Sequence, residues 1–308
     1  MDDVLNNLLD GLDTFAPQHY GNMTVIGLNI PENNNIDLMS LKKGLELGLV
    51  EISEVNESGS VGEVKVKNNA VTPLLILDGE EIIGSKQNRI ANATIIIEAK
   101  SEKIIPVSCT EAGRWQYNTD NFKYSTHMAT SRVRRDKLKS VSNSLRAENN
   151  FRSDQHQVWN NISITEKELN VHSNTSALHD AYQEKTVDID KYRDSFGIHE
   201  NQNGLMVFIN GRVVGLELIY NNARYREYHD KLVESYIIDA IGKINEETQS
   251  NEDNFSEFIE DIKKSKQESF DSVGLGVDYR IENDNITGSA VVFDDTVINA
   301  SFFRKIEV

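Results

Sequence analysis

The strongest constraint on the fold is a set of short apolar runs rich in β-branched residues, which fall into two blocks of the sequence. Such runs predict strands. The first block holds them at 23–30, 51–55, 62–67, 74–77, 93–97 and 103–108, and the last block at 276–281, 286–293 and 297–303. Between the blocks, runs at 204–210 and 212–219 are joined by Asn210-Gly211, a dipeptide that favours a two-residue hairpin turn. We therefore expect strands at both ends of the chain and a hairpin between them.

Apolar spacing predicts helices at 2–13, 36–49 and 221–247. Residues 246–270 are charged and low in apolar content, and we expect a second, exposed helix there. Residues 127–185 lack β-branched runs, and we interpret this stretch as a helical insert. The order of strands, insert, hairpin, helices and strands is that of an α+β protein with mixed or antiparallel sheets, and not a regular βαβ alternation. The C-terminal helices precede the last strands. No low-complexity linker interrupts residues 1–308, so we expect a single compact domain.

Composition narrows the classes of partner. The net charge of −17 creates a field that repels nucleic acid and anionic membranes. No apolar stretch reaches the ~20 residues needed to span a bilayer, and the acidic start does not resemble a signal peptide. We therefore expect a cytoplasmic protein with no membrane partner. Cys109 is the single cysteine, which excludes an intrachain disulfide, and the seven histidines are scattered, so no metal site is predicted and no cofactor can be named.

One segment runs against the acidic character of the chain. Residues 123–152 carry eight basic and two acidic side chains, a net charge of +6, so the remainder carries −23. Local basicity of this size could draw an anionic ligand or, less readily in so acidic a chain, nucleic acid. It could equally pair with acidic side chains of the protein itself.

The first candidate site segment is 78–89, which lies between two apolar runs. Four long polar side chains follow one another in it, namely Lys86, Gln87, Asn88 and Arg89. Beside a buried strand they would offer hydrogen-bond donors in two directions, which suits a phosphate, a carboxylate or a sugar. The alternative is a solvent-exposed hairpin tip.

The second candidate segment is 106–115, where an apolar run ends at Cys109. A thiol near Arg114 would have a lowered pKa and would be a better nucleophile, and Glu111 could act as a general acid or base. The alternative is that Cys109 is a buried small apolar side chain, as most free cysteines are. Trp115 could stack on a ligand or pack in the core.

The third candidate segment is 152–159. On a helix, Arg152, Gln155 or His156, and Trp159 would lie three and four residues apart on one stripe and could hold a planar ligand. The alternative is a helix that packs through Trp159 with its polar face in water.

These segments resemble the signature stretches of a family named for its association with ADP-ribosylglycohydrolases and rhodanese-phosphatase proteins. The stretches are Gly79-Glu-Glu-Ile-Ile-Gly-Ser-Lys-Gln-Asn-Arg89, Val107-Ser-Cys-Thr-Glu-Ala-Gly-Arg-Trp115, Arg152-Ser-Asp-Gln-x-x-x-Trp159 and the segment 204–215 around Asn210-Gly-Arg212. The resemblance spans roughly 15–305 and implies that Glu81 and the polar residues of the first two stretches share a pocket. It implies no reaction, and the link to ADP-ribose or NAD metabolism is one of association.

Three functions remain open on this reading. An enzyme acting on a nucleotide, ADP-ribose or a related phosphate ester would use Glu81, Cys109 and Glu111 as catalytic groups. Its ligand-binding residues would be Lys86, Gln87, Asn88, Arg89, Arg114, Trp115, Arg152, Gln155 and Trp159. A non-catalytic binding module would use the same pocket. A structural or assembly protein would use the same residues as a buried polar network, and the oligomeric state stays open.

Overall fold

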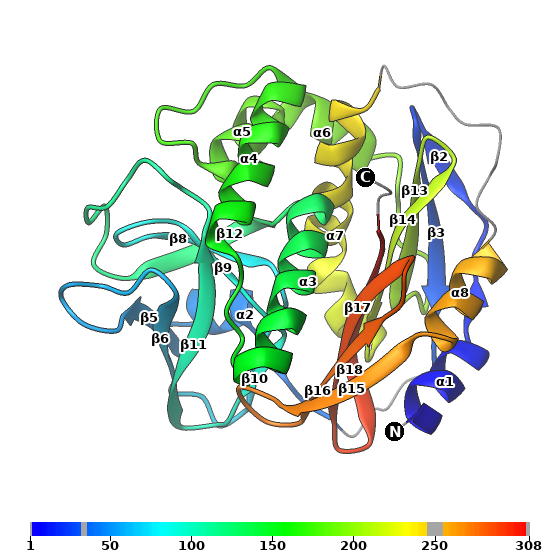
Figure 1. Ribbon diagram of the computed structural model, residues 1–308, viewed down its shortest axis with the longest axis horizontal. Coiled ribbons are helices and arrows are strands. Elements are labelled where there is room, and N and C mark those ends of the chain that lie inside the picture. Colours follow the sequence, from blue (N-terminus) through cyan, green and yellow to red (C-terminus); the bar gives the residue numbers. More distant parts are fainter. Residues whose placement is uncertain (1, 32–35, 245–254, 306–308) are drawn as a thin grey trace. The chain divides into compact units, whose positions relative to one another are not determined.

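A computed structural model describes residues 2–31, 36–244 and 255–305 (Figure 1). By their internal contacts the residues group into two compact units. Unit 1 is drawn from the segments 1–36, 185–271 and 277–308, and unit 2 from 37–184 and 272–276. Helices and strands occur in both units, so the chain is an α+β protein, as predicted. The expectation of one domain over the whole chain stays a prediction.

Unit 1 is built on an antiparallel sheet with the order β1-β3-β13-β14-β18-β17-β16-β15, and β2 also pairs with β3. The strands are β1 (Asp13–Thr14), β2 (Gln18–Tyr20), β3 (Met23–Asn29), β13 (Gly204–Ile209), β14 (Arg212–Ile219), β15 (Lys266–Asp271), β16 (Val277–Glu282), β17 (Ile286–Phe293) and β18 (Thr296–Arg304). Asn210 and Gly211 have φ angles of 51° and 76°, the left-handed backbone that a tight hairpin between β13 and β14 requires. The hairpin predicted at this dipeptide is confirmed.

Helices cover both faces of the unit 1 sheet. Successive side chains of each strand point to opposite faces, so one face is apolar and the other carries buried polar groups. On one face, Leu216 and Phe302 pack in a core with Leu5 and Phe258 of α1 and α8. On the other face, the buried Glu217 accepts a hydrogen bond of 2.7 Å from the Tyr236 hydroxyl of α7. The helices of this unit are α1 (Asp2–Asp10), α6 (Thr186–Arg193), α7 (Asn222–Gly242) and α8 (Phe255–Lys263).

Unit 2 contains two sheets. The smaller has the order β10-β7-β4 and is mixed, because β4 runs parallel to β7, whereas the larger is antiparallel with the order β12-β8-β9-β11-β6-β5. The strands are β4 (Met39–Ser40), β5 (Val50–Glu54), β6 (Glu63–Asn68), β7 (Leu74–Ile76), β8 (Glu80–Gly84), β9 (Arg89–Ala91), β10 (Ile95–Ile97), β11 (Ser101–Cys109) and β12 (Phe122–Met128). The larger sheet places the first two candidate segments on adjacent strands, since Cys109 pairs with Arg89.

The helical insert predicted at 127–185 contains three helices, α3 (Ser131–Glu148), α4 (Gln155–Leu169) and α5 (Leu178–Glu184). Side-chain caps explain where α3 and α4 begin: Thr130 accepts from the backbone of Val133, and Asp154 from that of Gln157. Asn149 and Asn170 adopt left-handed φ angles of 52° and 51° directly after α3 and α4 and end them.

Two predicted helices are wrong in part. At 36–49 only the six residues of α2 (Leu41–Glu46) are helical. Met39 and Ser40 instead form a strand against β7, and Ser40 caps the helix that follows. At 246–270, the described residues form α8 and then β15, because 266–271 pairs along β16. Residues 245–254 lie outside the described residues.

The core of unit 2 gives a matched stability test. Leu74 of β7 is fully buried, whereas Leu47, just after α2, is 59% exposed. Leu74→Ala should lower the free energy of unfolding by about 2–5 kcal/mol, because it removes buried methyl groups and leaves a cavity. Leu47→Ala should change it by less than about 0.5 kcal/mol. Urea unfolding of both variants checks this, and equal losses would contradict the packing described.

Candidate functional site

The polar tip of the β8–β9 hairpin is buried, which excludes the solvent-exposed alternative. Lys86, Gln87 and Asn88 are 9%, 4% and 9% exposed, and Arg89 at the start of β9 is fully buried. Ser85 adopts a left-handed φ of 43° at the tip. The side chains of these four predicted binding residues therefore lie inside unit 2 and must find partners there.

Arg114 holds this tip in place. Its guanidinium pairs with Glu111 through two hydrogen bonds, Nε to Oε1 at 2.9 Å and Nη2 to Oε2 at 2.6 Å. The same group donates to the carbonyls of Ser85 at 2.6 Å and Gly84 at 3.3 Å, and to Asn88 Oδ1 at 3.3 Å. Glu111 in turn accepts from the backbone N–H of Asn88 at 3.2 Å. The first two candidate segments thus meet, as the resemblance implied.

Two opposing effects act on the Glu111 carboxyl. Burial raises its pKa, but hydrogen bonds from Arg114, from the backbone of Asn88 and from Thr175 outweigh that effect and hold the pKa below its usual value. Glu111 is therefore a carboxylate already saturated with donors, which is a poor arrangement for a group that must exchange protons with a substrate.

Lys86 is enclosed by two aromatic rings. Its ammonium donates to the carbonyl of Ser58 at 2.8 Å and lies 4.9 Å from the ring centre of Tyr117 and 5.5 Å from that of Trp115. Trp115 and Tyr117 are 45% and 49% exposed, so each ring shields the cation with one face and meets solvent with the remainder.

Arg89 is committed to internal partners as well. It donates to Gln87 Oε1 at 3.1 Å and to the carbonyl of Ser60 at 3.4 Å, and it lies 3.9 Å from the buried carboxylate of Glu54. Its guanidinium also lies over Trp115, 5.6 Å from the ring centre. Burial lowers the pKa of Arg89, and neighbouring Glu54 opposes that change. Glu54 was not a predicted site residue.

Cys109 is fully buried, as its apolar alternative expected. Burial raises the pKa of the thiol to about 11, and the nearby Arg89 only partly offsets this. The thiol donates to the carbonyl of Val61 at 3.4 Å, and the side chain of Gln155 bonds both backbone polar groups of Cys109, at 2.7 and 2.9 Å. A nucleophilic role for Cys109 stays a prediction, and the burial that raises its pKa argues against it.

Glu81 meets a residue that the sequence analysis did not select. Its carboxylate accepts from the hydroxyls of Thr110 at 3.1 Å and Ser125 at 2.8 Å, and it lies 3.1 Å from Nδ1 of His179 on α5. The hydrogen bond with Glu81 raises the pKa of His179. Ninety-eight residues separate the two, so no local sequence signal could pair them.

The third candidate segment does not form one helical stripe. Arg152 lies before α4, whose first residue is Gln155, because Asp154 caps the helix. Gln155 turns to the backbone of Cys109, whereas Trp159 is half-buried in α4 with the ring of His156 at its edge, 5.8 Å between ring centres. The prediction that Arg152, Gln155 and Trp159 share one helix face is wrong.

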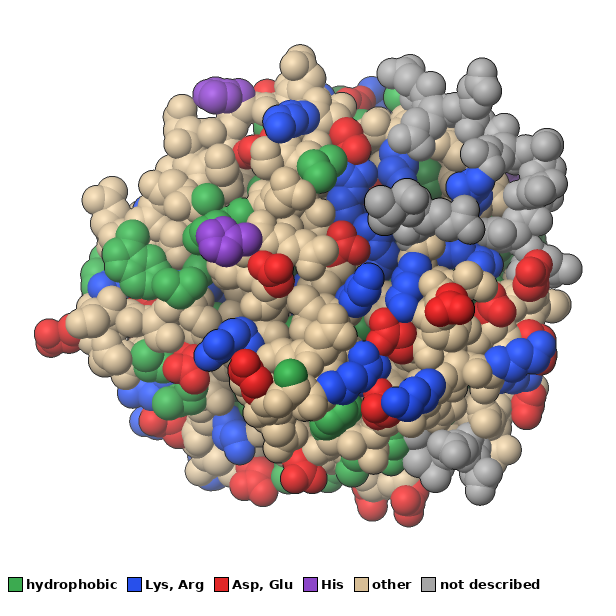
Figure 2. All heavy atoms as spheres, in the orientation of Figure 1, with side chains coloured by type: hydrophobic (Ala, Val, Ile, Leu, Met, Phe, Trp, Pro, Cys, Tyr) green, Lys and Arg blue, Asp and Glu red, His purple; other side chains and the backbone are tan. Residues whose placement is uncertain are grey.

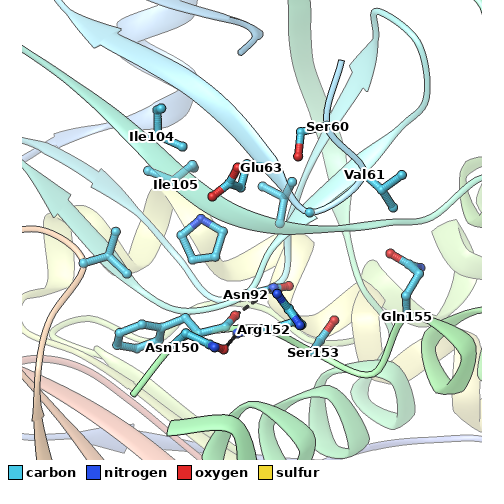
Figure 3. A pocket seen from close by; sticks show the side chains of 15 residues that line it. Ser60, Val61, Glu63, Asn92, Ile104, Ile105, Asn150, Arg152, Ser153 and Gln155 are labelled. Carbon is cyan, nitrogen blue, oxygen red and sulfur yellow. Dashed lines mark hydrogen bonds between the residues drawn. The ribbon is translucent and has the colours of Figure 1, made fainter. Parts of the chain in front are cut away.

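Arg152 and Gln155 instead line a groove of about 630 Å³ (Figure 3). In this view Ser60 and Val61 lie on one side, and Asn150 and Arg152 lie on the other. The groove is lined by Ser60, Val61, Gly62, Glu63, Asn92, Ile104, Ile105, Pro106, Val107, Asn150, Phe151, Arg152, Ser153, Gln155 and Val273. Among the described residues the guanidinium of Arg152 forms no hydrogen bond or ion pair, in contrast to Arg89 and Arg114.

The basic segment 123–152 is used in part inside the protein. Arg132 pairs with Glu168, and Lys137 pairs with the buried Asp78. Figure 2 shows acidic and basic side chains intermingled on the face that it presents. Arg132 and Lys137 therefore pair with acidic side chains of the protein itself, which is the second of the two alternatives.

In the part of the chain that the structure describes, none of the helices has both the length and the apolar character needed to cross a membrane.

The metal-ligating side chains do not converge in the described ranges, where no group of three or more His, Cys, Asp or Glu could hold an ion.

Comparison with known families gives one match: the ARG and Rhodanese-Phosphatase-superfamily-associated Protein domain matches residues 11–303. The chain belongs to this family. No curated protein and no solved structure matches the chain. The resemblance drawn from the stretches around Lys86 and Cys109 is confirmed.

In this member of the family, the two strongest stretches form one network, and the residues that complete it come from outside them. Glu54 lies in β5 and His179 in α5. Neither position carries a motif or a spacing that separates it from other glutamates and histidines of the chain. Only the pairing of β5, β6 and β11 and the packing of α5 bring them to the site.

The Arg114 network gives a second stability test. Arg114→Ala removes the cation paired with the Glu111 carboxylate and the donor of the Gly84, Ser85 and Gln116 carbonyls, and it should lower the free energy of unfolding by about 3–5 kcal/mol. Arg152→Ala is the matched control, since it removes an exposed guanidinium without a protein partner, and it should cost less than about 0.5 kcal/mol. Both values come from urea unfolding. If Arg114→Ala lowered the free energy of unfolding by less than about 1 kcal/mol, far below the expected ~3–5 kcal/mol, the ion pair would not be a structural element.

Cys109 gives a test of reactivity. At pH 8 a thiol with a pKa of about 11 is ionised in about one molecule in a thousand, against about one in four for a free cysteine. Alkylation by iodoacetamide should therefore be at least about 100-fold slower in the folded protein than in urea, and should accelerate with pH up to about 11. Mass spectrometry of timed samples measures both rates. Equal rates would restore Cys109 as a candidate nucleophile.

Proposed function

We propose that this protein binds a small organic phosphate, of the nucleotide or ADP-ribose class, in the groove beside Arg152. The observation that carries the proposal is that the guanidinium of Arg152 lines this groove and has no partner within the described residues. An arginine offers five donors in a planar fork that matches a phosphate. A cation left free at the edge of a concave surface is the group expected to meet an anionic ligand.

The rest of the groove suits the organic part of such a ligand. Its volume of about 630 Å³ lies within the range of roughly 300–1,000 Å³ usual for small-molecule sites. Pro106, Val107 and Phe151 supply apolar surface for a planar base. Glu63 also lines the groove, and its carboxylate has no hydrogen bond to the described residues, so it can accept from ribose hydroxyls.

The buried network supports this proposal as the frame of the groove. Arg89 donates to the carbonyl of Ser60 and Cys109 to that of Val61, which positions one wall. Gln155 bonds the backbone of Cys109 from the opposite wall. Lys86, Arg89 and Arg114 then act on the ligand only through the walls that they hold, because their own charges are already paired or shielded.

A purely structural role is the second candidate, and the internal pairing of Arg89 and Arg114 favours it. On that reading the groove binds nothing and the network only organises unit 2. A cytoplasmic location belongs to the binding proposal, since nucleotides and ADP-ribose are small intracellular anions. The proposal includes neither a metal nor a resident cofactor, and it leaves the chemical fate of the ligand to other groups.

Ligand-induced stabilisation tests the proposal. ADP-ribose or AMP at about 100 times its Kd should raise the free energy of unfolding by roughly 2.7 kcal/mol, visible as a rise in Tm. Inorganic phosphate at the same concentration should give a smaller rise, because it leaves the apolar wall uncovered and therefore binds with a higher Kd. Arg152→Ala should abolish the rise, and Lys123→Ala, which removes an exposed cation outside the groove, should keep it. No rise in the unmodified protein, or the same rise in Arg152→Ala, would favour the structural candidate.

A further inference from the structure

His179 directs one ring nitrogen at a buried carboxylate, and its other ring nitrogen makes no hydrogen bond to the described residues. Nδ1 lies 3.1 Å from Glu81 Oε2, and because a carboxylate can only accept, Nδ1 must carry the proton of this hydrogen bond. In the neutral imidazole the lone pair then resides on Nε2. Nε2 has no hydrogen-bond partner in the ranges that the structure describes, and the His179 side chain is 17% exposed.

The carboxylate is held more firmly than the pairing alone would require. Glu81 is 1% exposed and also accepts from the hydroxyls of Thr110 and Ser125. Both hydroxyls therefore bond the carboxylate and not Nε2 of His179. This arrangement differs from a Ser-His-acid triad, in which the hydroxyl bonds the imidazole. The oxygen that Nε2 can deprotonate is that of water or of a substrate.

The ring of His179 is also oriented by its surroundings. The backbone N–H of Leu178 donates to the carbonyl of Thr110 at 2.9 Å and docks the start of α5 on the strand that ends at Cys109. The ring of His127 lies 5.4 Å from that of His179, and it stacks on Tyr182 at 4.4 Å. An imidazole that bonds a carboxylate and lies against the His127 ring has little freedom to turn away from a bound molecule.

The charges that face His179 indicate the class of substrate. Glu81, in contact with the ring, and Asp180, the next residue of α5, both act on the imidazole in the direction that raises its pKa, so the local field is negative. Glu111 acts in the same direction, and its ion pair with Arg114 partly balances its charge. Asp180 is held by the Ser173 hydroxyl at 2.6 Å. His127 is the further titratable group in contact with the ring. A phosphate group would be repelled here, whereas the carbonyl carbon of an uncharged ester would not.

We propose that Glu81 and His179 form a general acid–base pair that hydrolyses an uncharged carboxylic ester. This inference goes beyond the binding of an organic phosphate in the groove and does not rest on it, since neither residue lines the groove. Nε2 takes a proton from water while the water oxygen bonds to the ester carbon. The bond from that carbon to the leaving oxygen then breaks, and the imidazolium returns the proton to this oxygen. One water is consumed, and an acid and an alcohol are formed.

Glu81 acts in this step as a positioning residue. It fixes the tautomer with the proton on Nδ1 and stabilises the imidazolium that forms after Nε2 takes the proton. Because the pKa of His179 is raised above its usual value of 6.5, the rate should increase with pH through a midpoint above that value, as the imidazolium becomes a base.

Hydrolysis of p-nitrophenyl acetate by the full chain tests the proposal. His179→Gln should lower the rate by about 100-fold, the size expected for loss of a general base. Glutamine can still donate to Glu81, so the variant should keep the Tm of the unmodified protein. His172→Gln is the matched control, because His172 is exposed and seven residues away on the chain, and it should keep the full rate. Glu81→Gln should lower the rate and shift the pH midpoint towards that of free histidine.

Three outcomes would overturn the proposal. The first is a rate in the unmodified protein no higher than that of free imidazole at the same concentration. The second is an equal rate in His179→Gln, or an equal loss in His172→Gln. The third is independent of activity: nitrogen-15 NMR of the imidazole should report the tautomer with the proton on Nδ1, and a proton on Nε2 would exclude the pair as a base.

Discussion

The ion pair between Arg114 and Glu111 is the interaction on which the site depends. The tip of the β8–β9 hairpin is buried, and a buried turn exposes carbonyls that the sheet cannot satisfy. One guanidinium satisfies two of them, at Gly84 and Ser85, and Glu111 balances its charge while it also accepts from the backbone of Asn88. An arginine suits this task because its donors form a rigid fork with no acceptor to satisfy. A lysine would supply the charge without that geometry.

Because of this constraint, the cations of the two strongest family stretches are used inside the protein. Contacts with other molecules are therefore left to groups outside those stretches. Lys86, Arg89 and Arg114 are each matched by carbonyls, carboxylates or aromatic rings of unit 2. Arg152 and Nε2 of His179, which have no hydrogen-bond partner for these side-chain groups among the described residues, lie at the margins of the same network. Hydrogen bonds link the network to both margins: Cys109 bonds Gln155 beside Arg152, and Thr110 bonds Glu81, the partner of His179. A rigid interior of this kind can hold both margins to a fixed geometry.

Features set by local chemistry were predictable from the sequence, and features set by pairing between distant segments were not. The hairpin at Asn210 follows from the backbone that this dipeptide favours, and the strand runs follow from β-branched composition. The start of the predicted helix at 36–49 was wrong because residues 39–40 pair with β7 and do not extend α2 at its N-terminus. At the site, the meeting of Glu111 with Asn88 was anticipated from the two stretches. Glu54 and His179 were not, because their roles exist only after β5 and α5 have packed.

The same asymmetry explains why a run of polar residues is ambiguous as a sign of function. Burying a cation is costly unless it is paired, so a motif such as Lys86 to Arg89 must find acceptors if it folds inward, and it then becomes as intolerant of substitution as a binding site. Sequence specificity alone cannot separate the two outcomes. The separating property is the partner of each charge. The guanidinium of Arg114 donates to six acceptor atoms of the protein, whereas that of Arg152 donates to none among the described residues. Binding is therefore to be sought at the charge that the protein leaves unmatched, even though the stretch around Arg114 carries the stronger family pattern.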